Sequence, residues 1–245
     1  MEHGGHVVHV ALARRGRFLI LIHGAVGCAA EIEPLAAALR HYTEVMTPNL
    51  IGHGGRPVPE RLTLEDMARD VIDQLDKARV GPTFVAGYSL GATLVLYLAR
   101  HFAPRFLGAV ALAPKVVFDA RTISHWTHLA DPERLRRNGR ALVHEKNHAP
   151  QDWVEVTRVN AALFRALGED PPLDDADLAA ITLPVMIVSG DRDPLVPWDE
   201  AKAIAKAIPG SHLAMFYGGA HPMAAIPVHQ VARAVAGWMD SVRAR

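Results

Sequence analysis

An apolar strand that runs through one tight turn into an apolar helix is the most constraining feature of this sequence. Residues 84–100 read FVAGYSLGATLVLYLAR, with Phe84–Ala86 as the predicted strand and Ser89 at the centre of a Gly-x-Ser-x-Gly pattern. Gly87 and Gly91 leave room for the strand and the helix to approach closely, so that the turn can push the serine hydroxyl outward. Ser89 is therefore a candidate nucleophile. The alternative is an ordinary glycine-rich turn with a solvated serine.

Short apolar runs alternate with helical patterns along the rest of the chain. The apolar residues of these runs are continuous, which is typical of parallel strands buried on both faces. The predicted strands are Phe18–Ile22, Phe84–Ala86, Leu107–Leu112, Val185–Val188 and Leu213–Tyr217. Leu64 to Leu75 has helical spacing with Thr63 as N-cap, and Pro227 begins a final helix. The sequence thus predicts an α/β fold, a mostly parallel central sheet flanked by helices.

The stretch from Val116 to Ala180 contains no convincing strand and interrupts this alternation. A connection of this length is usually functional or carries its own structure. We interpret residues 116–180 as a helical cap, or lid, that lies over one end of the sheet. Because no linker or repeat divides the chain, we expect residues 1–245 to form a single domain that contains this insertion.

A serine hydroxyl is a poor nucleophile unless a base takes its proton and a carboxylate orients that base. The predicted strand at Leu213–Tyr217 is followed by GGAHPM, which makes His221 the candidate base. The predicted strand before it is followed by SGDRDPLVP, which offers Asp191 and Asp193 as the acid. We expect the backbone N–H groups of Leu90, next after the serine, and of Ala25, in HGAVG after the first strand, to form an oxyanion hole.

Five segments in order, LIHG, NLIGHGGRP, GYSLGA, SGDRDPLVP and GGAHP, are similar to the landmarks of α/β-hydrolase fold enzymes with a helical cap. The resemblance covers the chain from about Phe18 to its end. It favours Asp193 over Asp191 as the acid, with Asp119 as a third position that some such enzymes would use. Serine at the turn distinguishes the chain from haloalkane dehalogenases and epoxide hydrolases, which resemble this fold but use aspartate there.

A second motif points to different chemistry. His144, Glu145 and His148 form the His-Glu-x-x-His pattern of zinc peptidases, which requires both histidines on one helical face and a third ligand. Pro150 would end that helix at about His148, because a residue before proline is disfavoured in helices. With 14 histidines in the chain, we interpret the pattern as coincidental.

Other histidines are open to two interpretations. His3, His6 and His9 could bind a metal, but a solvated terminus is the simpler alternative. His125 and His128 could line the pocket or face water. We expect no metal and no cofactor.

The cap is expected to decide the substrate. Trp126, Trp153 and Phe164 are the predicted pocket residues, with the core of the cap as their alternative role. The segment RLRRNGR carries Arg134, Arg136, Arg137 and Arg140. One of these could hold a substrate carboxylate, and a solvated helix face is the alternative.

The 26 basic and 26 acidic residues balance, which gives no electrostatic reason to bind nucleic acid or an anionic membrane. One cysteine, no signal-peptide pattern and no membrane-length apolar run favour a cytoplasmic protein, monomer or homodimer. The leading hypothesis is a serine hydrolase that cleaves small or medium carboxylic esters through an acyl-enzyme. Lactonase, thioesterase or C–C bond hydrolase activity and a non-catalytic ligand-binding role are the alternatives.

Overall fold

The computed structural model describes residues 18–244, and its centre is a six-stranded sheet in which all neighbouring strands are parallel. The strand order is β2-β1-β3-β4-β5-β6. The strands are β1 Phe18–Ile22, β2 Glu44–Met46, β3 Thr83–Tyr88, β4 Phe106–Leu112, β5 Val185–Gly190 and β6 His212–Phe216. The prediction of a parallel sheet is confirmed, and His3, His6 and His9 lie outside the described residues.

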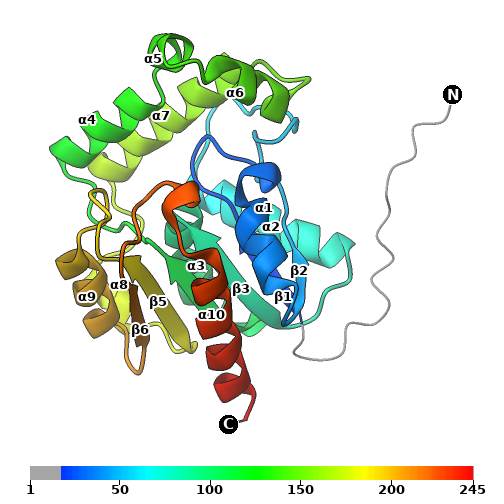
Figure 1. Cartoon of the computed structure of the whole chain (residues 1–245), viewed down its shortest axis with the longest axis vertical. Coiled ribbons are helices and arrows are strands. Elements are labelled where there is room, and N and C mark those ends of the chain that lie inside the picture. The colour runs from blue at the N-terminus through cyan, green and yellow to red at the C-terminus, as the bar shows by residue number, and fades with distance from the viewer. Residues whose placement is uncertain (1–17, 245) are drawn as a thin grey trace, which may run out of the picture.

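Helices cover both faces of the sheet (Figure 1). One face is packed by α1 Ala29–Leu39 and α10 Val228–Arg243, and the other by α2 Leu64–Lys77, α3 Leu90–His101 and α9 Trp198–Ala207. Neighbouring residues of one strand enter opposite cores: Phe84 packs with the α1 and α10 side, and Val85 with the α2 and α3 side. This two-sided burial is the physical reason for the continuous apolar runs in the sequence.

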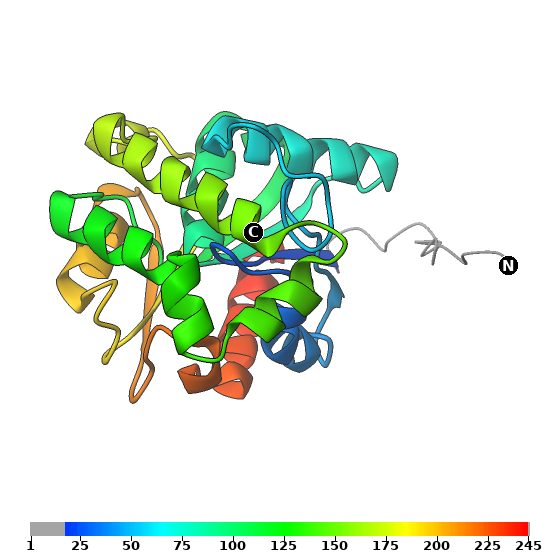
Figure 2. The same cartoon turned by 90° about the horizontal axis from the view of Figure 1, so that it is seen from above.

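The insertion between β4 and β5 is helical. It contains α4 Ala120–Leu129, α5 Pro132–Arg137, α6 Ala141–His148, α7 Trp153–Glu169 and α8 Asp175–Ala179. Helices α4 to α7 lie over one end of the sheet (Figure 1), and the view from above shows them across the face nearest the viewer (Figure 2). The last helix, α8, instead packs against α3 and α9, where Asp177 forms an ion pair with Arg100 at 3.1 Å. The cap over the sheet therefore consists of α4 to α7.

The predicted elements agree with the structure except at the edge of the sheet. The first strand has the predicted bounds, and the others differ from the prediction by one or two residues at an end. Strand β2 was not predicted, because its three residues are exposed or half-buried and form no apolar run. Thr63 caps α2 as predicted, since its side chain accepts the N–H of Asp66 at 3.0 Å. Short 3-10 turns at Ala103–Arg105 and Met223–Ala225 complete the described elements.

Within residues 18–244, no helix has both the length and the hydropathy that a membrane span requires.

Candidate active site

Ser89 lies at the turn between β3 and α3, in a backbone conformation that residues with a side chain rarely adopt. Its φ is 56° and its ψ is −121°, and such conformations cost on the order of 1–3 kcal/mol. A Cβ atom at Gly87 would lie 2.1 Å from the carbonyl oxygen of Gly91, and one at Gly91 would lie 2.5 Å from that of His23. The two glycines thus let the strand, the helix and the loop after β1 meet around the serine.

A hydrogen-bonded chain leads from this serine to a buried carboxylate. The Oγ atom of Ser89 lies 2.9 Å from Nε2 of His221, and Nδ1 of His221 lies 2.8 Å from Oδ2 of Asp193. Because an ionised carboxylate can only accept, the ring proton belongs on Nδ1, and Nε2 is left to accept the serine proton. All three residues are buried. The arrangement can accept a proton from Ser89 and stabilise the imidazolium that results.

The three candidate acids lie in different surroundings. Of these, Asp193 is the one that contacts His221. Asp191 accepts the N–H of Gly218 at 2.6 Å and so joins the loops that follow β5 and β6. Asp119 caps α4 by accepting the N–H of Thr122 at 2.7 Å. Asp191 and Asp119 therefore have structural contacts of their own.

Two aromatic residues hold His221 in place. The hydroxyl of Tyr88 donates to the backbone carbonyl of His221, and burial, with the charges of Glu31 and Asp193, raises the pKa of Tyr88 and keeps this donor protonated. Trp126 from α4 meets the His221 ring edge to face, with ring centroids 5.8 Å apart. Sequence reasoning missed Tyr88, since the serine motif allows any residue at this position.

The predicted oxyanion donors belong to the two segments that border Ser89. Leu90 is the first residue of α3, and an N–H in the first turn has no acceptor within its helix. Ala25 lies in the loop after β1 and lines the same cavity as Ser89. In the described part of the chain, neither N–H has a hydrogen-bond acceptor. Both N–H groups remain open to an acceptor from a ligand.

A buried histidine supports the loop of Ala25 from below. Nδ1–H of His23 donates to the carbonyl of Gly24 at 2.8 Å, and its Nε2 accepts the N–H of Leu50 at 3.1 Å. Both ring nitrogens are thus used by the backbone. Burial, together with His53, lowers the pKa of His23 to about 3, so the ring is neutral at physiological pH. His23 therefore positions the loop and does not transfer protons.

The cap holds the same loop from above through His148 at the end of α6. Nε2–H of His148 donates to the carbonyl of Val26 at 3.1 Å, and Nδ1 accepts the N–H of Gly54 at 3.2 Å. Asn160 of α7 accepts the N–H of Val26 at 3.4 Å and donates to Nε2 of His53 at 2.9 Å. Val26 itself has a φ of 54°. The cap thus fixes a strained residue directly beside Ala25.

These contacts give the second histidine of the His-Glu-x-x-His pattern a structural role. Helix α6 ends at His148, as predicted, and the rings of His144 and His148 are stacked with centroids 6.0 Å apart. Both nitrogens of His148 are already engaged by the backbone, and Glu145 is exposed. Across residues 18–244, no three histidine, cysteine or acidic side chains gather as metal ligands would. The donor set does not fit zinc, and His148 instead joins the cap to the loop after β1.

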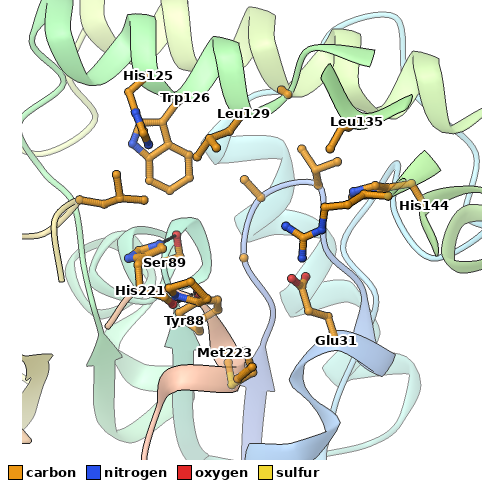
Figure 3. Close-up of a pocket in the computed structure, with 18 of the residues that line it drawn as sticks. Glu31, Tyr88, Ser89, His125, Trp126, Leu129, Leu135, His144, His221 and Met223 are labelled. Carbon is orange, nitrogen blue, oxygen red and sulfur yellow. Dashed lines mark hydrogen bonds between the residues drawn. The ribbon is translucent and has the colours of Figure 1, made fainter. Parts of the chain in front are cut away.

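A cavity of about 600 Å³ lies between the cap and the sheet (Figure 3). Ser89 and His221 line it from the side of the sheet, and Trp126 and Phe164 line it from the cap, with ring centroids 4.8 Å apart. The third predicted pocket residue, Trp153, is not among the lining residues.

Trp153 packs instead within the cap, against the ring of His144 and under the guanidinium of Arg136, 5.3 Å from the ring centroid. The prediction that Trp153 lines the pocket is therefore wrong, and Trp153 has the alternative role, in the core of the cap. The two histidines left open are both exposed, and of the two it is His125 that lines the cavity.

Comparisons with known proteins identify the family of the chain. Residues 19–235 match the model of the alpha/beta hydrolase family. The chain is 31% identical over 195 residues to a thermostable monoacylglycerol lipase from Bacillus sp., covering 78% of this chain and 76% of the lipase. It is 29% identical over 181 residues to 3-oxoadipate enol-lactonase 1 from Acinetobacter baylyi, covering 66% of each.

Solved structures show the same fold. A thermophilic esterase from Thermogutta terrifontis superposes with a TM-score of 0.72 at 22% sequence identity, covering 92% of this chain and 90% of the esterase. An enol-lactonase from Burkholderia xenovorans superposes with a TM-score of 0.68 at 17% identity, covering 93% and 91%. Family model, relatives and fold agree: this chain belongs to the alpha/beta hydrolase family and is a hydrolase.

Proposed function

We propose that this hydrolase cleaves small or medium carboxylic esters through an acyl-enzyme formed on Ser89. The observation that carries the proposal is the pair of hydrogen bonds that joins Ser89 to His221 at 2.9 Å and His221 to Asp193 at 2.8 Å. A relay of this geometry gives a serine hydroxyl the base that it needs for attack on a carbonyl.

In the first half of the reaction, Oγ of Ser89 attacks the ester carbonyl carbon while Nε2 of His221 takes the hydroxyl proton. Asp193 holds Nδ1–H and stabilises the imidazolium. The carbonyl oxygen becomes an oxyanion, which the N–H groups of Ala25 and Leu90 stabilise. His221 then gives its proton to the leaving alkoxide, and the acyl group remains on Ser89.

In the second half, a water molecule takes the place of the alcohol. Nε2 of His221 accepts a proton from that water as its oxygen attacks the acyl carbon, and the same oxyanion donors stabilise the second intermediate. The proton returns to Oγ of Ser89 as the carboxylic acid leaves. A lactone, which is an internal ester, would follow the same steps, and the 29% identical relative is named an enol-lactonase.

We also propose that the cap of α4 to α7 shapes the substrate site, since Trp126 and Phe164 form an apolar wall facing Ser89. The test is initial rates on p-nitrophenyl esters from acetyl to dodecanoyl, with Ser89→Ala as the paired variant. Turnover that disappears in the variant supports the proposal. The preferred acyl chain length then indicates how long an acyl group fits against the apolar wall. Equal turnover by both proteins would overturn it. No turnover by the natural enzyme would favour a ligand-binding role.

A further inference from the structure

The cavity has charged lining residues as well as apolar ones. Arg134 of α5, Arg140 between α5 and α6, and Glu31 of α1 line the same cavity as Ser89. Figure 3 shows Glu31 on the far side of this space from Trp126. The ester site and these charged residues thus share one cavity, and a single substrate could contact both.

The four arginines of RLRRNGR separate into two pairs in the structure. Arg136 is engaged outside the cavity, by Glu133 and by the ring of Trp153. Arg137 is exposed and is not among the lining residues. Arg134, which is half-buried, and Arg140, which is exposed, both line the cavity.

Neither lining arginine has a carboxylate partner within the described part of the chain, since none of the ion pairs found there includes Arg134 or Arg140. Glu31 is the acidic residue among the lining residues. Desolvation raises the pKa of Glu31, and Arg140 acts in the opposite direction.

Two guanidinium groups against one carboxylate leave the cavity lining with a net positive charge at neutral pH. Two of the lining histidines have lowered pKa values: burial, then His128 and Arg134, lowers the pKa of His125, and burial, His148 and Arg140 lower that of His144 to about 4. Nδ1 of His144 is also buried without a hydrogen-bond partner among the described residues. A buried polar atom of this kind is usually satisfied by water or a ligand.

We propose that the substrate is an ester or lactone that carries a carboxylate at the end remote from its scissile bond, and that Arg134 and Arg140 bind this carboxylate. Guanidinium groups match a carboxylate in geometry and charge, and a cleft of one sign raises the local concentration of the opposite ion. The proposal deepens the proposed ester hydrolysis and rests on it. Binding energy gained at this remote group is available to position the ester carbonyl at Ser89.

The test compares charged and neutral esters of equal length by proton release. Monoethyl glutarate and adipate are paired with ethyl pentanoate and hexanoate, and 3-acetoxypropanoate is paired with propyl acetate, so that the carboxylate is placed on the acyl or on the alcohol side. We expect a charged member to have the higher kcat/KM in at least one pair. We expect the ratio of kcat/KM for that charged ester to kcat/KM for its neutral partner to fall about tenfold or more in the Arg134→Gln/Arg140→Gln double variant.

Two further variants sharpen the result. Arg136→Gln, with its guanidinium outside the cavity, should leave the ratio unchanged, and Glu31→Gln should raise it, because the opposing negative charge is removed. A preference for the neutral member of every pair, or a ratio that does not respond to the double variant, would overturn the proposal.

A failure of ester hydrolysis itself is distinguished by binding. Calorimetry of monoethyl adipate and 3-acetoxypropanoate with Ser89→Ala does not depend on turnover. Binding of either ester that weakens about tenfold on adding Arg134→Gln and Arg140→Gln would support the carboxylate site even if no ester were cleaved. Absent binding of both, or binding unaffected by these changes, would contradict it.

Discussion

Asp193 accepts the Nδ1–H of His221 at 2.8 Å with one carboxylate oxygen, while its other oxygen accepts the backbone N–H groups of Leu195 and Val196 at 2.8 and 3.0 Å. Backbone N–H groups of the loop after β5 therefore hold the carboxylate in the position from which it orients the histidine. Two residues earlier, Asp191 bonds to the backbone instead. We therefore expect Asp193 to orient the catalytic histidine and Asp191 to have a structural role.

The pair allows a matched test of the acid. Asp193→Asn should lower kcat by about 10⁴, because an amide no longer stabilises the imidazolium and the wrong histidine tautomer is favoured. Asp191→Asn should change kcat less than about tenfold, since an amide oxygen can still accept the N–H of Gly218. Steady-state kinetics on one p-nitrophenyl ester decides between them. A large loss in Asp191→Asn with little loss in Asp193→Asn would reverse the assignment.

The second prediction concerns His148. Replacing it with alanine removes the donor to Val26 and the acceptor for Gly54, so the loop of Ala25 is held less firmly. We expect kcat to fall by about 10- to 100-fold, since a small displacement of the proposed oxyanion donor, the N–H of Ala25, is costly. The matched variant is Glu145→Gln on the same helix, whose side chain is exposed. A zinc peptidase site would require the opposite, with Glu145→Gln inactive.

The third prediction compares two helical glycines by urea unfolding. At Gly91 an added Cβ would lie 2.5 Å from a backbone carbonyl oxygen, which cannot move aside as a side chain would. Gly91→Ala should therefore destabilise the protein. Gly237 of α10 has no atom within 4 Å of such a Cβ, so Gly237→Ala should raise the free energy of unfolding by up to about 1 kcal/mol. Equal effects of the two changes would contradict the close approach of β1 and α3.

The fourth prediction is a pH dependence of stability. Burial lowers the pKa of His23 to about 3 and of His53 to about 4, below the unfolded value of about 6.5. The unfolded chain therefore binds protons that the folded chain does not. The contribution of these two neutral rings to the free energy of unfolding is fully present above about pH 6.5. It decreases as the pH drops toward about 4. Each ring contributes a slope that approaches about 1.4 kcal/mol per pH unit once the pH is well below 6.5 and still above the folded-state pKa of that ring.

Urea unfolding between pH 7 and 5 measures this slope. In His53→Gln the average slope over this range should be smaller by about 1 kcal/mol per pH unit, the share of one histidine that is protonated below about pH 6.5 in the unfolded chain alone. His229→Gln, at an exposed position of α10, should leave it unchanged. The same slope in all three proteins would show that His53 is protonated equally in both states.

Much of the fold follows from local patterns. The bounds of β1 were predicted because its five residues are all apolar and all buried, and the end of α6 was predicted from Pro150. Strand β2 escaped because a short edge strand needs no apolar run. Part of the site could also be predicted. Ser89 and His221 each follow a strand that the sequence reveals, so we could expect them to meet at the carboxyl ends of the parallel strands.

Other parts of the site depend on contacts between distant segments. Tyr88 reaches the carbonyl of His221, which lies 133 residues away, and His148 reaches Val26 across 122 residues. The sequence alone gave no reason to prefer Phe164 over Trp153 as a pocket residue. Both lie on one helix, and only the packing of that helix decides which side chain faces the pocket. The separation of the cap arginines into lining and outer pairs depends on the same packing.

The most direct measurement is the detection of the acyl-enzyme itself. The protein is mixed with p-nitrophenyl acetate, quenched in acid during turnover, digested, and mapped by tandem mass spectrometry. We predict an acetyl group on Ser89 in the natural protein. In Ser89→Ala we predict neither acetylation of that peptide nor turnover. Continued turnover by Ser89→Ala, or an acetyl group on another residue whose removal abolishes turnover, would contradict it.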